Sequence, residues 1–180
     1  MLQVLLLWEL YRAGSKAEEL NSLANHHFNL NILHLDVTDE SQYPSFIHEV
    51  GGILDGDGLN LLINNAGITF RGSFDSITSQ GMMDVYKTNV VAPLMLSKAC
   101  HGLLKKASIS AAGPMGPSKA TVVHISSDLG SIERNGLGNL VGGLYAYRPS
   151  KTALNMVTKS MSIDLKPDGK FTLHHIMCTE

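Results

Sequence analysis

The sequence predicts an α/β protein in which helices cover both faces of a parallel β-sheet. Apolar runs of strand length alternate along the chain with longer segments of helical period. Several of these runs are continuously apolar, which is typical of strands buried on both faces. The chain has 180 residues and no internal repeat, enough for one domain with a substantial core. We therefore expect a single doubly wound domain over residues 1–180.

The first half of the chain is expected to supply three strands and two helices. The opening run from Gln3 to Trp8 is interpreted as a buried strand. Ser15 and Glu18 form a capping box that starts a short helix. The next elements are a strand at 29–35, a helix at 38–54 and a strand at 59–64. Pro44 fits that helix only in its first turn.

The opening run does not resemble a targeting or membrane segment. No Lys or Arg precedes it, and no small-residue cleavage site follows it. Glu9 and Arg12 end it far short of the roughly 20 apolar residues that span a bilayer. We therefore expect a cytoplasmic protein with no membrane partner.

The second half is expected to begin with one long helical region at about 76–106, which contains Pro93. A Gly/Pro/Ser-rich loop at 107–120 and a strand at 121–126 follow it. A Gly-rich loop at 128–143 then leads to a helix at 148–165 and a last strand at 170–177. The strands and helices thus alternate from end to end.

Charge and cysteine content exclude several functions. Fourteen basic residues against sixteen acidic ones leave no electrostatic footprint for nucleic acid. Cys100 and Cys178 are far apart and are expected to be reduced thiols, as in cytosolic proteins. His174 and His175 lie near Cys178, but without ligand spacing they are interpreted as strand residues, and no metal site is expected.

The most informative segment is LYAYRPSKTALN, at 144–155, because it places Tyr147 and Lys151 four residues apart at a helix start. Residues at this spacing share one helix face. An ammonium about 4 Å from a phenolate stabilises it by roughly 4 kcal/mol, which lowers a phenol pKa of about 10 by about 3. Tyr147 is then a candidate proton donor or acceptor for a carbonyl or alcohol. Tyr145 has no Lys at this spacing.

Three further polar positions support this interpretation. Ser127 in HISS ends the strand before the Tyr147 helix, and LINNAG, at 62–67, ends another strand. Ligands of open α/β sheets bind at the carboxyl ends of strands. Asn89 lies within the expected long helix, where helix propensity gives no reason for an Asn.

In this order, LINNAG, the Asn89 context, ISS and YRPSK resemble the short-chain dehydrogenase/reductase family, and in particular its sniffer and C-factor-like carbonyl reductases. The likeness covers about 11–177 and implies a Rossmann-like fold with an NAD(P) cofactor. It implies that Tyr147 is the general acid/base and that Lys151 lowers its pKa and binds the nicotinamide ribose. Ser127 would orient the substrate carbonyl, with Ser131 as an alternative.

The remaining implied roles concern a proton relay and the cofactor. Asn89 would anchor a water-linked relay. Cofactor contacts are implied for Asp36, Val37, Asn65, Ala66 and Gly67. Asp36 can also be interpreted as a helix cap for the segment that follows it, a role compatible with the first.

Arg12 stands where this branch has a basic residue for a 2′-phosphate, which implies NADP(H) in preference to NAD(H); the alternative is a solvated surface charge. The family's N-terminal Gly-rich turn, which binds the pyrophosphate, has no counterpart in the sequence, and neither has its C-terminal lid. The fold is thus expected to be an incomplete Rossmann-like domain, truncated at both ends. Without its central strand, either the opening run slides into that slot or the sheet is split.

The resulting hypothesis is an NADPH-dependent carbonyl reductase acting on a small carbonyl substrate. The alternative is a catalytically silent isoform or fragment that acts at most by homodimerising through the helices near 76–105 and 149–165. A dehydratase or epimerase of the same family is a third hypothesis. The apolar residues that could form such a dimer, or simply the core, are Leu94, Met95, Leu103, Leu154, Val157 and Met161.

Overall fold

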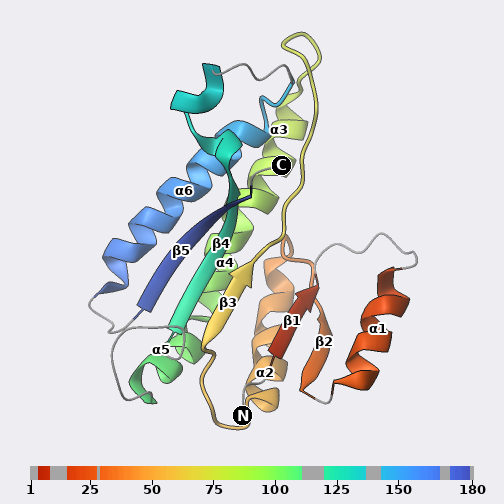
Figure 1. Cartoon of the computed structure of the whole chain (residues 1–180), viewed down its shortest axis with the longest axis vertical. Coiled ribbons are helices and arrows are strands. Elements are labelled where there is room, and N and C mark those ends of the chain that lie inside the picture. Colours follow the sequence, from red (N-terminus) through yellow and green to blue (C-terminus); the bar gives the residue numbers. More distant parts are fainter. Residues whose placement is uncertain are drawn as a thin grey trace.

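The computed structural model describes residues 4–8, 16–27, 29–110, 120–136, 143–166 and 171–178. Within these ranges, parallel strands lie beside helices that connect them in sequence (Figure 1). The α/β class expected from the sequence is therefore confirmed. Ser15 and its capping box lie outside the described residues.

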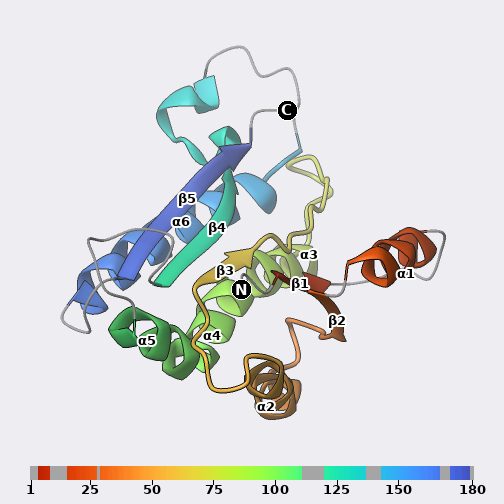
Figure 2. The ribbon, with the colours of Figure 1, turned by 60° about the horizontal axis from the view of Figure 1, so that its bottom comes forward.

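The described strands form two sheets. The strands are β1 (Val4–Trp8), β2 (Leu30–His34), β3 (Leu61–Asn64), β4 (Ala120–Ser127) and β5 (Phe171–Cys178). β1 pairs with β2, while β3 pairs with β4 and β4 with β5. Figures 1 and 2 show β1 and β3 side by side, but no pairing joins them in the described part of the chain. Of the two outcomes expected for the opening run, the split sheet is the one found.

The larger helices lie on both sides of the strands (Figure 2). They are α1 (Lys16–His26), α2 (Tyr43–Ile53), α3 (Ser79–Tyr86), α4 (Ala92–Ala99), α5 (His101–Ser110) and α6 (Tyr147–Asp164). α1 packs beside β2 on one side, whereas α2, α4 and α6 lie on the other. None of the described helices combines the length and the apolar character needed to cross a membrane. Short 3₁₀-helices complete the description: η1 (Glu40–Gln42), η3 (Asp128–Gly130) and η4 (Glu133–Gly136).

The prediction of one long helix at 76–106 is wrong in detail. The helix starts only at Ser79, after Thr78 caps it by accepting a hydrogen bond from the Gly81 N–H at 3.1 Å. It changes to a π-helix, η2 (Lys87–Val91), and then continues as α4 with Pro93 in its first turn. Pro93 stands in the first turn of α4 and has no N–H, so it cannot donate the hydrogen bond that would continue the helical series there.

Strand β3 is covered on one face only. Leu62 and Asn64 are buried on the side of α4, but Leu61 and Ile63 are 44% and 46% exposed. The expectation that this apolar strand is covered on both faces is therefore wrong, because no described helix packs on the second face.

One apolar cluster joins the two sheets. It contains residues of β2 and β3, of the helices α2, α4 and α5, and of β4. Its fully buried members include Val50, Leu62, Cys100, Leu104 and Val122. Each large apolar side chain contributes roughly 1.5–3 kcal/mol when buried. The helix layer thus holds together two sheets that backbone hydrogen bonds do not connect.

Candidate active site

The first turn of α6 brings Tyr147 and Lys151 together. Lys151 is only 3% exposed, and its Nζ lies 5.5 Å from the centre of the Tyr147 ring. The same Nζ donates a hydrogen bond to the backbone carbonyl of Ile125 at 2.8 Å. A buried ammonium is costly unless it is hydrogen-bonded. The helix therefore holds a positive charge beside the phenol, within the protein.

Asn89 lies in the π-helix and has no exposed surface. Its Oδ1 accepts a hydrogen bond from the Ile68 N–H at 2.9 Å, and its Nδ2 donates to the Ile68 carbonyl at 3.0 Å. Nδ2 also donates to Ser150 Oγ at 3.0 Å. π-helical turns occur frequently at functional sites. Because Pro93 stands four residues after Asn89 and has no N–H, the Asn89 carbonyl cannot receive the usual helical hydrogen bond from it.

Gly67 brings the backbone that follows β3 close to these two side chains. A Cβ on Gly67 would lie 3.4 Å from Asn89 Oδ1 and 3.5 Å from Lys151 Nζ. Asn65 and Gly67 are exposed, whereas Ala66 packs against the apolar cluster. Three sequence-predicted residues, Gly67, Asn89 and Lys151, therefore meet at one point at the carboxyl end of β3.

Ser127 ends β4, as expected, and is buried. Its Oγ accepts a hydrogen bond from the Leu129 N–H at 3.2 Å and donates a long one to Asp128 Oδ1 at 3.4 Å. Lys151 reaches the same strand two residues earlier, at Ile125. Ser131, the alternative, accepts from the Arg134 N–H at 3.3 Å.

Asp36 and Val37 follow β2, at the carboxyl edge of the other sheet. Asp36 is exposed, and its Oδ1 accepts hydrogen bonds from the N–H and the hydroxyl of Thr38, both at 2.8 Å. The interpretation of Asp36 as a helix cap is wrong, since Asp39 caps η1 by accepting from the Ser41 N–H. Val37 has its side chain in the core. Arg12 lies outside the described residues.

These residues fit the two ends of a nicotinamide dinucleotide. An exposed carboxylate after β2 can accept hydrogen bonds from the amino group of an adenine ring. The Gly67 backbone and the Lys151 ammonium, close together, suit the ribose at the opposite end. The turn between β1 and α1 lies outside the described residues. Among the described side chains, no three His, Cys, Asp or Glu are grouped to hold a metal ion.

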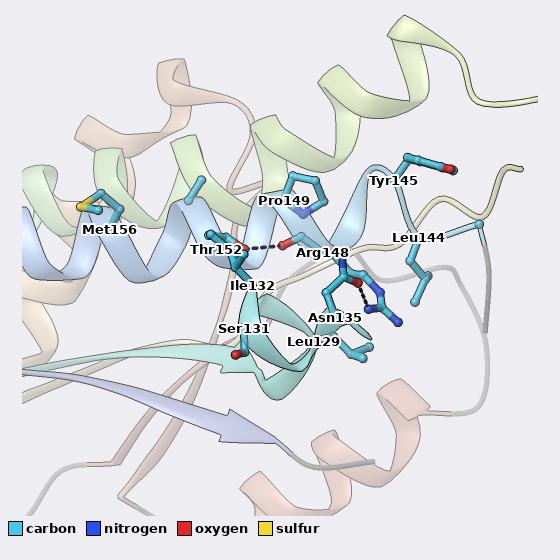
Figure 3. A pocket seen from close by; sticks show the side chains of 12 residues that line it. Leu129, Ser131, Ile132, Asn135, Leu144, Tyr145, Arg148, Pro149, Thr152 and Met156 are labelled. Carbon is cyan, nitrogen blue, oxygen red and sulfur yellow. Dashed lines mark hydrogen bonds between the residues drawn. The ribbon is translucent and has the colours of Figure 1, made fainter. Parts of the chain in front are cut away.

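A cavity of about 640 Å³ lies on the other face of α6 (Figure 3). On α6 it is lined by Arg148, Pro149, Thr152, Ala153 and Met156, one helix face. Tyr147 and Lys151 do not line it, because they lie on the opposite face of the helix. Ser131, the alternative serine, lines this cavity, whereas Ser127 does not.

Sequence reasoning did not single out Ser150 or Ile68, which hold Asn89 in place. Ser150 is completely buried and stands in the YRPSK segment, one residue before Lys151. Its position three residues after Tyr147 places it on the same helix face, which was the available signal. Ile68 contributes only its backbone, so no side-chain pattern points to it.

Comparison with known proteins identifies the family. A model described as short chain dehydrogenase matches residues 6–179. The NADPH-bound carbonyl reductase from chicken fatty liver is 39% identical, with a TM-score of 0.87 over 96% of this chain and 66% of that one. The carbonyl reductase Sniffer of D. melanogaster is 40% identical, with a TM-score of 0.82 over 93% of this chain and 66% of that one.

A curated relative shows the same branch: C-signal of Myxococcus xanthus is 34% identical over 116 residues, 64% of this chain and 61% of its own length. The chain belongs to the short chain dehydrogenase family, in its sniffer and C-factor-like branch. The Rossmann-like fold expected from the sequence is thus confirmed. The chain spans 50% to 61% of the length of the first curated relatives that it matches.

Proposed function

We propose that this chain carries the catalytic centre of an NADPH-dependent carbonyl reductase. The observation that carries the proposal is the buried Lys151 ammonium, 5.5 Å from the centre of the Tyr147 ring and next to Gly67. A buried cation beside a specific titratable neighbour marks a candidate functional site. The proposal treats residues 1–180 as one dinucleotide-binding domain. It places the protein in the cytoplasm, in keeping with the free thiol of Cys100.

Proton transfer is the task of the α6 residues. NADPH, when bound, supplies a hydride to the carbonyl carbon of the substrate. Tyr147 gives its phenolic proton to the carbonyl oxygen, and the Lys151 charge stabilises the phenolate that remains. Ser127 orients the same oxygen with its hydroxyl. The 3.4 Å bond from Ser127 to Asp128 is long, so exchanging it for a substrate oxygen costs little.

Reprotonation of Tyr147 requires a path from solvent. We assign the entrance of that path to the backbone carbonyl of Asn89, which Pro93 leaves without its helical donor. A water on this carbonyl would pass a proton towards Lys151 and from there to Tyr147. Asn89 Oδ1 and Lys151 Nζ lie close to the same point beside Gly67, which brings these two residues of the route near each other.

The cofactor is assigned to the edge formed by the ends of β2 and β3. Asp36 and Val37 would contact the adenosine, and Asn65, Ala66 and Gly67 would line the nicotinamide half. Arg12 would bind the 2′-phosphate, which gives the preference for NADPH over NADH. The substrate class is a small aldehyde or ketone.

Turnover tests this proposal. The purified chain is mixed with NADPH and a panel of aliphatic and aromatic aldehydes and ketones, and loss of reduced-nicotinamide absorbance is followed together with alcohol formation. Alcohol appearing in equal amount with oxidised cofactor is expected. Substrate conversion without cofactor oxidation would instead identify a dehydratase or epimerase, and no conversion of any carbonyl would contradict the proposal.

A second function, homodimerisation, is favoured by exposed apolar side chains on two helices. Leu154 and Met161 are buried, so at these two positions the alternative that the residues belong to the core is the one found. The exposed apolar residues on α3 and α6 are instead Met82, Met83, Tyr86, Met156 and Ile163. We propose that they form the contact between two copies. Sedimentation equilibrium of the wild type and of Met83→Lys with Met156→Lys tests this: a dimer that becomes a monomer is expected, and a wild-type monomer would contradict it.

A further inference from the structure

We propose that Ser150 is a positioning residue that ties Asn89 to the turn carrying Tyr147. This inference rests on the proposed reductase function but concerns a residue to which that function assigns no role. It is carried by a chain of hydrogen bonds between segments far apart in sequence. Ser150 Oγ accepts from Asn89 Nδ2 at 3.0 Å and donates to the backbone carbonyl of Tyr147 at 2.6 Å.

The direction of these hydrogen bonds is fixed by chemistry. An amide NH₂ can only donate, so Ser150 must accept from Asn89 and send its single proton to the Tyr147 carbonyl. Asn89 cannot turn its amide over, because the N–H and carbonyl of Ile68 meet its Oδ1 and Nδ2 in a fixed order. The donor and the acceptor of each hydrogen bond in this series are therefore fixed by the neighbouring hydrogen bond.

Burial gives these links their importance. Asn89 and Ser150 are both 0% exposed, so water cannot replace a lost partner without a change of structure. A serine hydroxyl bonded to a carbonyl three residues earlier is common in helices and needs no second partner. Here the hydroxyl also takes the second amide proton of a residue in another helix.

This series of hydrogen bonds links the backbone after β3, at Ile68, to the first turn of α6, at Tyr147. In the proposed reaction, the first segment lines the nicotinamide and the second carries the acid. Hydride and proton must reach the two ends of one carbonyl bond, so the distance between these segments must be held constant. Ser150 fixes that distance through Asn89, without touching the substrate or the cofactor.

The first test does not depend on activity. Side-chain amide exchange of Asn89 is measured by NMR on the full chain with ¹⁵N-labelled asparagine. Loss of one buried hydrogen bond in Ser150→Ala is expected to speed that exchange about fivefold or more. Ser150→Cys, with a weak sulfur acceptor of similar size, is expected to give an intermediate rate. Equal rates in the wild type and both variants would overturn the proposal.

Ser126→Ala is the matched control. Ser126 is also buried and donates to Asn155 Oδ1 at 2.6 Å, but it has no bond to Asn89. Its replacement is expected to leave the Asn89 exchange rate unchanged. Equal acceleration in Ser126→Ala would mean a general loosening of the core and would also overturn the proposal.

A double-mutant cycle then tests the functional role. Ser150→Ala is expected to lower kcat about fivefold to tenfold with little change in the Kd of NADPH. In an Asn89→Ala background, Ser150→Ala is expected to lower kcat hardly any further, because the hydrogen bond through which Ser150 acts is already lost. Additive effects would show that Ser150 acts independently of Asn89 and would contradict the proposal. A wild-type chain without turnover would refute the reductase function, while amide exchange would still decide the role of Ser150.

Discussion

Asn89 and Ile68 hold each other at two points, through the Asn89 side-chain amide and the Ile68 backbone N–H and carbonyl, at 2.9 and 3.0 Å. The side chain is thereby used to fix the loop after β3 to the π-helix. We propose that the backbone carbonyl of Asn89, to which Pro93 cannot donate, anchors the relay water. In this proposal the side chain of Asn89 has the structural role and its backbone carbonyl has the chemical one.

Replacing Pro93 tests this division. Pro93→Ala supplies an N–H that can bond to the Asn89 carbonyl and compete with a relay water. We expect kcat to fall about tenfold, since only the proton supply and not the acid itself is affected. Pro44→Ala, in the first turn of α2, is the matched control and is expected to leave kcat unchanged. Full activity of Pro93→Ala would refute the assignment of the relay to this carbonyl.

The two tyrosines that precede and open α6 provide a second test. Tyr147→Phe removes the phenolic proton and is expected to lower kcat by about 10²–10⁴. Tyr145→Phe keeps the edge-to-face contact with Phe74, whose ring centre is 6.2 Å away, and is expected to retain activity. Steady-state rates of both variants decide the matter. A larger loss in Tyr145→Phe than in Tyr147→Phe would mean that the acid has been wrongly assigned.

Lys151→Met separates catalysis from stability. Exchanging a buried ammonium for an apolar side chain of similar length removes a desolvation cost but also the hydrogen bond to the Ile125 carbonyl. Because these two effects oppose each other, the thermal midpoint is expected to change little. Turnover is expected to fall at least about a hundredfold, because the phenolate loses its neighbouring charge. Lys159→Met, on an exposed position of the same helix, is the control. Activity and stability lost together in Lys151→Met would show that the ammonium is mainly structural.

Much of the candidate active site could be predicted from the sequence. The helix period places Tyr147 and Lys151, four residues apart, on one helix face. The apolar strand pattern places Ser127 at the end of a strand. Both are local patterns. The π-helix could not be predicted, because its extra residue depends on contacts of Asn89 with Ile68 and Ser150, which are remote in sequence. Pro93 can be seen in the sequence. That it withholds a hydrogen bond from the Asn89 carbonyl follows only once the helix is known to continue through Pro93.

The architecture of the sheet was predictable only in part. Apolar content cannot distinguish a strand with two covered faces from one with an open face, so Leu61 and Ile63 were expected to be buried. The sequence allows two arrangements of the opening strand, in the central slot or in a separate sheet, because strand order depends on long-range neighbours. The apolar cluster of α2 and α4 that holds the two sheets together emerges only from the packing.

The pH dependence of stability gives a test that is independent of function. Burial raises the pKa of the Cys100 thiol to about 12, and burial also raises the pKa of the Tyr43 phenol to about 12. Both groups are held protonated in the folded state, so folded protein binds more protons than unfolded protein at high pH. The free energy of unfolding is therefore expected to be unaffected below about pH 9 and to fall progressively between about pH 9 and pH 12.

Thiol labelling in a Cys178→Ser background tests the burial and protonation of Cys100 alone. Folded protein is expected to leave Cys100 unmodified at pH 8, whereas protein unfolded in urea reacts at the rate of a free thiol. Tyr43→Phe, which loses the hydrogen bond to the Val37 carbonyl, is expected to be less stable by about 1 kcal/mol at neutral pH and less sensitive to alkali. Rapid labelling of the folded chain would contradict the burial of Cys100.

Cofactor binding by the chain itself tests the central claim most directly. Purified protein is titrated with NADPH and, separately, with NADH, while heat release and thermal midpoint are recorded. We predict saturable binding of one NADPH, a midpoint that rises with cofactor concentration, and weaker binding of NADH; at one hundred times the Kd the stabilisation is about 2.7 kcal/mol. No heat and no change of midpoint up to millimolar NADPH would contradict the account and leave a Tyr147–Lys151 pair without a cofactor to serve.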